Sequence, residues 1–222
     1  MIKERLKRGS LFYHLYLYYS LIFREKYFIK RKTYSQSGED LVIKNFFKNN
    51  IGKYVDIGCF HPLRHNNTCL LFNNGWSGAN IDINHTSIDF FNILRKSDLN
   101  IVAALSDKNN VELNFFYHHA FSTINSLNKE NVTKFTSKYS VEKIITRKFE
   151  DVINFNFNFL NIDCEGEDFK ILKTINLKKF KPELICIEIL DVTEKNLFYD
   201  YLKEHDYTIL EIKGLSHIFR KV

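Results

Sequence analysis

The chain has 222 residues, of which 45% are hydrophobic and 26% charged, a composition that excludes a disordered or fibrous protein. This length is enough for one α/β domain with a sizeable core. Residues 1–32 hold nine Lys or Arg and two Glu, a sum of +7 against the total of +6, so the rest of the chain sums to −1. A nucleic-acid-binding body would carry a basic face of its own, so we expect no nucleic-acid partner.

Residues 1–32 are predicted to form a basic, aromatic, helical arm, separate from a domain over residues 33–222. The apolar run GSLFYHLYLYYSLIF (9–23) is shorter than the roughly 20 residues that a membrane-spanning helix needs. Its basic flanks suit the surface of an anionic membrane, but a helix packed on the domain or on a second subunit is the favoured alternative. No small-residue cleavage site follows the run, so we expect a cytoplasmic protein, with peripheral contact at the inner membrane surface as one alternative.

The remaining chain alternates between helical and strand patterns. In chain order we predict a helix at 38–50, a strand at 53–58, a helix at 66–75, a strand at 76–84, a helix at 85–97, a strand at 100–106, an alternating segment at 111–118, a strand at 157–166, a helix at 167–175, a strand at 183–190, a helix at 193–205, and paired strands at 206–212 and 215–220. This order predicts an α/β fold with a mostly parallel central sheet, helices on both faces and an antiparallel carboxyl-terminal strand pair.

The four cysteines are expected to be free thiols that pack as small hydrophobic groups. They are Cys59, Cys69, Cys164 and Cys186, and no two of them form a CxxC pair. Free thiols of this kind are typical of a reducing compartment.

Polar groups stand at the carboxyl ends of the predicted strands, where open α/β sheets bind their ligands. The first strand ends at Asp56 and Gly58, and the second ends at Asp82, 24 residues beyond Gly58, a spacing that suits an acid bonded to a ribose diol. Ser106 ends the third strand. The fourth ends at Asp163.

The loop GCFHPLRHNNT after the first strand lacks the glycine-rich run that cradles a pyrophosphate. The pattern therefore indicates an adenosine-type cofactor without a pyrophosphate, and S-adenosylmethionine has no phosphate at all. A nicotinamide-dependent oxidoreductase is the alternative enzyme class, disfavoured because no GxGxxG follows the first strand. A non-catalytic glycan- or protein-binding module on the same fold stays open as well.

Several segments together resemble the FkbM-type S-adenosylmethionine-dependent methyltransferases. They are YSQSGEDLVI, YVDIGCFHPLRHNNTCLLFNNGWSGANIDIN, FSTINSL, FLNIDCEGEDFKILKTI and PELICIEI, which span about residues 34–190. The resemblance implies a Rossmann-like methyltransferase that methylates a hydroxyl oxygen, with saccharides of surface glycans such as capsule or lipopolysaccharide as prominent acceptors. The carboxylate Asp168 departs from the commoner Glu of the family. A homo-oligomer is one further possibility that the sequence leaves open.

The resemblance also assigns roles to individual residues. It implies that Asp56, Gly58 and Phe60 line the cofactor loop and that Gln36 and Glu39 reach the methionine end of the cofactor. It further implies ribose bonding by Asp82, a place near adenine for Ser106, and a place at the reaction centre for Asp163.

A sugar hydroxyl is a poor nucleophile until it loses its proton, so we expect a base or a metal beside the methyl group. The expected bases or ligands are Asp163, Glu165 and Glu188, with His61 and His118 behind them. Asp163 and Glu188 are also expected as ligands of Mg²⁺, a cation that prefers oxygen. Glu167 and Asp168 are more simply explained as acids that stabilise the first turn of a helix. Residues 120–127 are expected to form part of the acceptor pocket.

Overall fold

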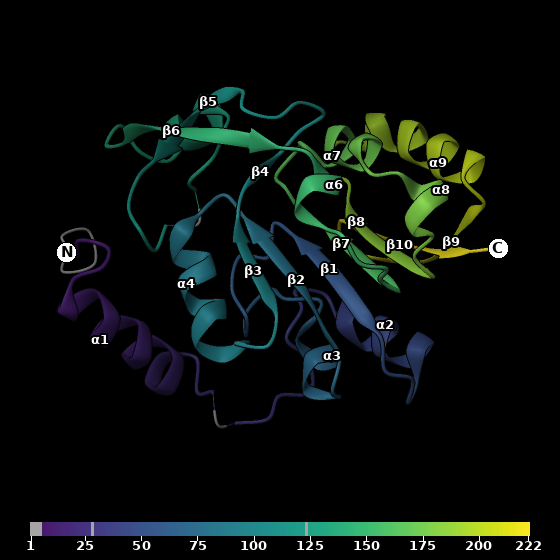
Figure 1. The fold of residues 1–222 in the computed structure, drawn as a ribbon, viewed down its shortest axis with the longest axis horizontal. Coiled ribbons are helices and arrows are strands. Elements are labelled where there is room, and N and C mark those ends of the chain that lie inside the picture. The colour runs from purple at the N-terminus through teal and green to yellow at the C-terminus, as the bar shows by residue number, and fades with distance from the viewer. Residues whose placement is uncertain (1–5, 28, 123) are drawn as a thin grey trace.

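The computed structural model describes residues 6–27, 29–122 and 124–222. Its central sheet has the strand order β3-β2-β1-β7-β8-β10-β9 (Figure 1). The strands are β1 (Lys53–Ile57), β2 (Ser77–Asp82), β3 (Leu99–Val102), β7 (Phe159–Ile162), β8 (Leu184–Glu188), β9 (Tyr207–Lys213) and β10 (Ser216–Lys221). The first five of this order pair in parallel, whereas β10 runs antiparallel to both β8 and β9. The predicted α/β class, with its antiparallel closing pair, is confirmed.

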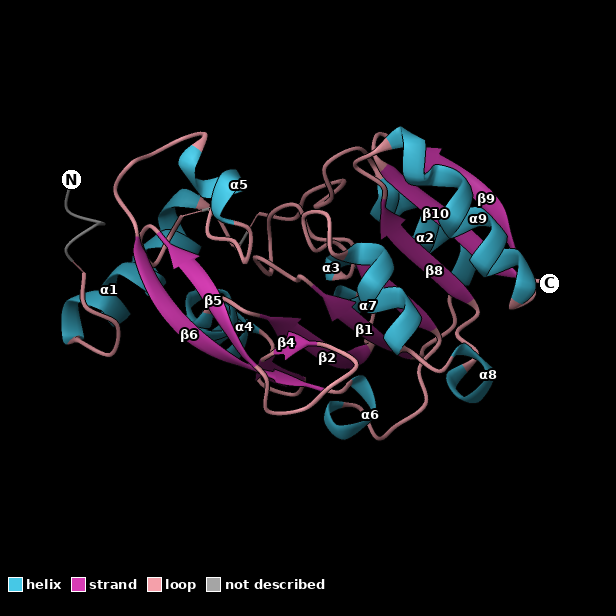
Figure 2. Ribbon diagram, turned by 90° about the horizontal axis from the view of Figure 1, so that it is seen from above, coloured by secondary structure: helices cyan, strands magenta, loops and turns pink. Residues whose placement is uncertain are grey.

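Helices cover both faces of this sheet, as the view from above shows (Figure 2). Alternate side chains of a strand point to opposite faces, so Val55 packs with one helix layer and Tyr54 with the other. The first layer contains α6 (Phe149–Val152), α7 (Asp168–Thr174), α8 (Leu177–Phe180) and α9 (Lys195–Glu204), which follows a 3-10 turn at Val192–Glu194. The opposite layer contains α2 (Glu39–Phe47), α3 (Cys69–Asn73) and α4 (His85–Leu94). All four cysteines are free, and three of them are buried.

A second, three-stranded sheet corrects the prediction of one strand at 100–106. β3 ends at Val102, and the chain then leaves the central sheet to form β4 (Ala104–Leu105) in the order β4-β6-β5. β5 (Glu112–Tyr117) is the alternating segment, and it pairs antiparallel with β6 (Ser140–Arg147), which the sequence did not predict. Most of β6 is exposed, so its sequence lacks the apolar alternation of a half-buried strand. A short helix, α5 (Lys129–Thr133), lies between β5 and β6 in the chain.

The amino-terminal arm packs on the domain through one face of its helix. The arm contains α1 (Leu11–Tyr19), which continues into a π-helix, η2 (Ser20–Arg24). Tyr13, Leu17 and Leu21 are buried in a cluster that includes Phe90 of α4. The Tyr13 hydroxyl also donates to Asp89 at 2.7 Å. The inner face of the arm therefore packs on the domain, which is one of the two alternatives expected for the arm.

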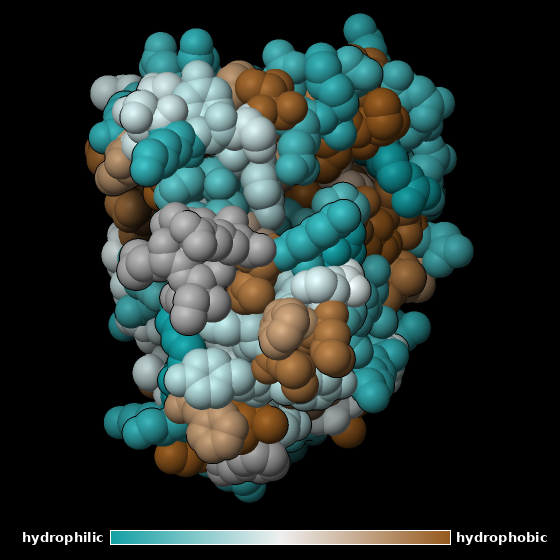
Figure 3. Space-filling view, turned by 90° about the vertical axis from the view of Figure 1, so that its left-hand side faces the viewer, coloured by the Kyte–Doolittle hydropathy of each residue, from teal (hydrophilic) through white to brown (hydrophobic). Residues whose placement is uncertain are grey.

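The outer face of the arm is exposed and apolar. Phe12 is 72% and Phe23 66% exposed, and Leu11 and Leu15 also face solvent. Apolar side chains gather in patches on the molecular face that carries α1 (Figure 3). Within the described residues, no helix has both the length and the apolar character to cross a bilayer. The boundary expected between the arm and the domain at residue 32 stays a prediction.

Candidate functional site

The loops after β1 and β7 are pressed together at the carboxyl edge of the central sheet. Gly58 has a φ of +75°, and a Cβ atom on it would lie 1.7 Å from the carbonyl oxygen of Asp163. Only glycine fits a position with a positive φ and such a close backbone approach. The glycine of the motif Asp56-Ile57-Gly58 is therefore required for packing, because it lets the backbone after β1 approach the backbone after β7.

Asp56 is fully buried and organises the loop after β1. Its carboxylate accepts hydrogen bonds from Thr68 Oγ1 at 2.8 Å, Asn161 Nδ2 at 2.8 Å and Asn66 Nδ2 at 3.2 Å. Burial raises its pKa, and these three bonds oppose the rise. All three partners lie inside the protein, so the carboxylate orders the loop from within. Contact between Asp56 and a cofactor stays a prediction.

A buried arginine, Arg95, fixes the same loop and was missed in the sequence. Its guanidinium donates to Thr68 Oγ1 and Asn66 Oδ1, both at 2.8 Å, and to the Pro62 carbonyl at 2.9 Å. It also lies over the ring of Phe91, 4.9 Å from the centroid. A charge at the end of a helix most often faces solvent, so nothing in the local pattern marked Arg95 as a core residue.

Asp82 ties the loop after β2 to the loop after β1. Its carboxylate accepts hydrogen bonds from the backbone N–H groups of Phe60 at 2.9 Å and Asn84 at 2.7 Å. Phe60 has a φ of +50°, so this bond holds a strained residue in place. Burial raises the pKa of Asp82 to about 6. Its expected bond to a ribose diol stays a prediction.

Four residues expected at the cofactor and reaction centre line one small cavity, which we call the acidic cavity. Gln36, Glu39, Asp163 and Glu188 line it together with Ser37, His65, Asn67, Leu215 and Ser216. The cavity measures about 20 Å³, where about 10–15 Å³ holds one water molecule. Glu39 belongs to α2 and Gln36 to the loop before it, whereas Glu188 belongs to β8 and Asp163 to the loop after β7; these segments lie far apart in the chain.

Asp163 and Glu188 are two of the three acids that line the acidic cavity, and their surroundings favour the protonated form of each. Burial, and then the neighbouring charge of Glu188, raises the pKa of Asp163 well above its ordinary value. Burial, followed by the charges of Glu165 and Asp168, raises the pKa of Glu188 to about 7. Oε2 of Glu188 is buried and has no hydrogen-bond partner among the described residues. An unpaired buried acceptor beside two further acids suits a ligand with a positive charge.

The loop of residues 33–40 carries Gln36 and Glu39 to this cavity. Asp40 is buried and accepts from Tyr34 N at 2.7 Å and from Ser35 Oγ at 2.7 Å, so it holds the loop folded. Glu39 is also buried and accepts from Ser37 N. The exposed side chains of Gln36 and His65 bond each other at 3.0 Å at the cavity mouth.

The other acids of the segment after β7 are placed differently. Glu165 is exposed, and Glu167 pairs with Lys170 at 2.9 Å. Asp168 accepts from the backbone N–H groups of Cys164 and Gly166 and closes the turn before α7, which gives it a structural position; burial raises its pKa to about 6.

Two further expected site residues, Ser106 and His118, lie away from the acidic cavity. Ser106 follows β4, and its N–H donates to the Arg147 carbonyl in the second sheet. His118 follows β5, where its Nδ1 lies 3.4 Å from Ser122 Oγ. Their expected roles stay predictions.

The expected Mg²⁺ site finds no support. Across the described ranges, no group of three or more His, Cys, Asp or Glu side chains is arranged to hold a metal ion. Asp163 and Glu188 line the same cavity, but no third side chain of the described residues is arranged to complete a metal site with them.

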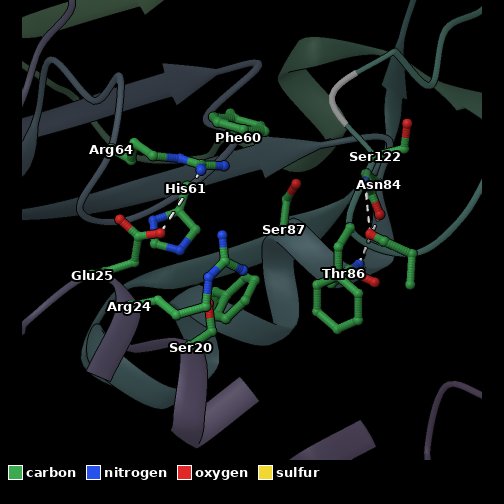
Figure 4. Close-up of a pocket in the computed structure, with 13 residues that line it drawn as sticks. Ser20, Arg24, Glu25, Phe60, His61, Arg64, Asn84, Thr86, Ser87 and Ser122 are labelled. Atoms are coloured by element: carbon green, nitrogen blue, oxygen red, sulfur yellow. Dashed lines mark hydrogen bonds and ion pairs between the residues drawn. The ribbon is translucent and has the colours of Figure 1, made fainter. Parts of the chain in front are cut away.

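His61 lies in a second and larger cavity, of about 140 Å³, which we call the arm cavity (Figure 4). It lies between the arm and the domain and is lined by Ser20, Arg24, Glu25, Phe60, His61, Arg64, Asn84, Thr86, Ser87, Phe90, Ala120, Phe121 and Ser122. Nδ1 of His61 accepts a hydrogen bond from Leu63 N at 3.1 Å, so the neutral ring carries its proton on Nε2. A ring in that tautomer offers a donor and not a base. The catalytic role expected for His61 does not fit this geometry.

Comparisons with known proteins identify the family and the fold of the chain. A family model described as the Methyltransferase FkbM domain matches residues 50–209. The crystal structure of methyltransferase FkbM from Methylobacillus flagellatus KT matches with a TM-score of 0.57 and 15% identity, covering 99% of this chain and 56% of that one. This chain thus spans little more than half the length of that protein.

Two methyltransferase structures match more distantly. Ribosomal protein L11 methylase from Lactobacillus delbrueckii subsp. bulgaricus has a TM-score of 0.46 and 11% identity, with 83% of this chain and 78% of that chain covered. Precorrin-6y C5,15-methyltransferase from Geobacter metallireducens GS-15 has a TM-score of 0.46 and 10% identity, with 87% and 93% covered. No match was found among curated protein sequences.

Proposed function

The chain belongs to the FkbM methyltransferase family, and from this premise we propose that it transfers a methyl group from S-adenosylmethionine to a hydroxyl oxygen of a saccharide. The family and the Rossmann-like fold together imply S-adenosylmethionine as the cofactor. The saccharide acceptor rests on the family resemblance of the sequence. The nicotinamide-dependent alternative is set aside, because the family is one of methyltransferases.

The observation that carries the proposal is the acidic cavity. Asp163, Glu188 and Glu39 place three acids around a buried acceptor, Oε2 of Glu188, that has no partner among the described residues. S-adenosylmethionine carries two positive groups at one end, the sulfonium and the amino group, so its charge complements these acids. When bound, the cofactor supplies a methyl group already activated by the sulfonium charge.

In this proposal the chain contributes orientation and a proton acceptor. Gln36 and Glu39, on their loop, hold the cationic end of the cofactor together with the carboxyl groups of Asp163 and Glu188. The Asp163–Glu188 pair receives the proton of the acceptor hydroxyl, since a pKa near 7 suits a base at neutral pH. At about 20 Å³ the cavity holds no more than a water molecule or two, so the exposed side chains of Gln36 and His65 must separate when the cofactor enters.

The exposed face of the arm supports a second part of the proposal, peripheral contact with an anionic membrane. Phe12 and Phe23 stand out from this face, and the basic residues Lys7, Lys26 and Lys30 are exposed on the same arm. Aromatic side chains beside lysines suit the headgroup region of a bilayer.

The proposal is tested by incubating the protein with methyl-labelled S-adenosylmethionine and a panel of free, nucleotide-linked and lipid-linked sugars, with and without a chelator. We expect label transfer to at least one acceptor, insensitive to the chelator. Asp163→Asn is expected to abolish transfer while S-adenosylhomocysteine still binds. Asp200→Asn, an exposed acid on α9, serves as the matched control.

Each alternative predicts a different result in this experiment. Full turnover by Asp163→Asn would refute the role of Asp163 as proton acceptor, but it would not refute S-adenosylmethionine as the cofactor. Failure of the wild-type protein to bind either S-adenosyl compound would favour the non-catalytic module. Loss of turnover with a chelator would show that a metal ion, and not the carboxyl pair, activates the acceptor hydroxyl.

A further inference from the structure

The arm cavity and the acidic cavity differ in the kind of hydrogen-bonding atom that each leaves unpaired. Among the described residues, three buried side-chain atoms lack a partner: His61 Nε2, Arg64 Nε and Glu188 Oε2. The first two belong to residues that line the arm cavity, and the third to a residue that lines the acidic cavity. A buried donor without a partner is costly, so two such donors at one cavity indicate a missing acceptor.

His61 is a donor because of its surroundings. Only 4% of the residue is exposed, and its ring packs against Phe90 with centroids 4.6 Å apart. Nδ1 is occupied by the N–H of Leu63, so Nε2 carries the proton. Burial, followed by the charge of Arg64, lowers the pKa of His61 well below its ordinary value, which keeps the ring neutral.

The cavity is also electropositive. Figure 4 shows the His61 ring between the ends of the Arg24 and Arg64 side chains. The one acid in the lining, Glu25, is held between Arg64 at 3.7 Å and Arg31 at 4.0 Å, so its charge is balanced. Arg24 donates to the Tyr16 hydroxyl through Nη1, and a guanidinium carries five N–H donors in all.

The amino-terminal end of α4 faces the same space. Thr86 and Ser87 in the first turn line the cavity, together with the capping residue Asn84. The amino terminus of a helix carries a partial positive charge and attracts anions. Two arginines, an N–H of a neutral histidine and a helix terminus thus converge on a space of about 140 Å³, large enough for a small group and not only a water molecule.

We propose that the arm cavity binds a phosphate group, such as the phosphate of a sugar phosphate. Phosphate has several acceptor oxygens that match forked arginine donors and a neutral N–H donor at once. The arm supplies part of the cavity, so phosphate binding also ties the arm to the domain. This inference does not depend on methyl transfer, because binding is measured without S-adenosylmethionine.

The test is a calorimetric titration of the full chain with inorganic phosphate, with a sugar 1-phosphate and with the same sugar lacking phosphate. We expect saturable binding of both phosphates and none of the neutral sugar. Arg64→Gln and Arg24→Gln should each weaken phosphate binding by about tenfold or more, since each removes a charge-assisted donor. Arg220→Gln, an exposed arginine on β10, should leave the affinity unchanged.

Two further measurements keep the test independent of folding. Arg24 is exposed, so Arg24→Gln is expected to keep the wild-type melting temperature, and a loss of binding at that melting temperature supports the site. In protein with ¹⁵N-labelled histidine, phosphate should shift the Nε2–H signal of His61. Absence of phosphate binding to the wild-type protein would overturn the proposal. So would wild-type affinity in both Arg64→Gln and Arg24→Gln. Binding only to vesicles that contain phosphatidic acid, with no affinity for the soluble phosphates, would overturn it too.

Discussion

Glu188→Gln is expected to raise the stability of the folded protein at alkaline pH. The pKa of Glu188 is raised in the folded state from an ordinary 4.5 to about 7, with burial as the main cause. The folded state therefore binds the proton more tightly than the unfolded state does. Between pH 4.5 and 7 the native protein holds more protons, so its free energy of unfolding falls as the pH rises through that window.

The magnitude follows from the width of the window. At about 1.4 kcal/mol per pH unit, the upper bound of the loss is about 3.4 kcal/mol. Part of Glu188 remains open to solvent, whose screening reduces this to about 1–2 kcal/mol. Glutamine cannot ionise, and it has nearly the size and shape of the protonated glutamic acid side chain. The variant should therefore melt about 2–8 °C above the wild type at pH 8.

Thermal unfolding followed by circular dichroism from pH 4.5 to pH 8.5 measures this effect. We expect the wild-type and Glu188→Gln curves to converge near pH 4.5 and to separate as the pH rises. Glu204→Gln, an exposed acid at the end of α9, should follow the wild type throughout. A Glu188→Gln curve parallel to that of the wild type, or below it at pH 8, would show that the carboxyl pair does not hold its proton as described.

Three further predictions concern the buried arginine, the close approach of strands and the arm. Arg95→Met should lower the free energy of unfolding in urea by about 3–5 kcal/mol, because it removes a buried charge that faces Asp56 and Asp98 and the bonds that this charge donates to the loop after β1. A loss under 1 kcal/mol would contradict this. Gly58→Ala should prevent stable folding, since its methyl group would overlap the carbonyl oxygen of Asp163, and a wild-type melting curve would refute that contact. The double variant Phe12→Ser, Phe23→Ser should sediment less with anionic vesicles than wild type but equally with neutral ones; unchanged sedimentation with anionic vesicles would argue against membrane contact through the arm.

The order of the central sheet could be predicted because its strands are buried on both faces. β1, β7 and β8 read as continuous apolar runs, and parallel pairing places their carboxyl ends at one edge. That reasoning brought Asp163 and Glu188 to the same edge. The loop of Gln36 and Glu39 was placed with them only through the family resemblance, since no spacing rule brings the start of α2 to that edge.

The parts that could not be predicted depend on contacts between distant segments. Arg95 looks like an ordinary charged residue at a helix end, and its burial depends on the loop of residues 62–68 folding over it. The arm cavity exists because η2 packs beside the loop after β1, a contact between segments about 40 residues apart that no periodicity encodes. The tautomer of His61 follows from a single backbone contact, so the sequence indicated a base where the structure places a donor.

The most direct test of the account is the affinity for S-adenosylmethionine as a function of pH. Proton binding and cation binding compete for the Asp163–Glu188 pair, so the dissociation constant should fall by about tenfold between pH 6 and pH 8, with protons released on binding. S-adenosylhomocysteine, which lacks the sulfonium charge, should show a shallower dependence. Equal affinities at pH 6 and pH 8 for S-adenosylmethionine, with no proton release, would contradict the central claim that this carboxyl pair holds the cationic end of the cofactor.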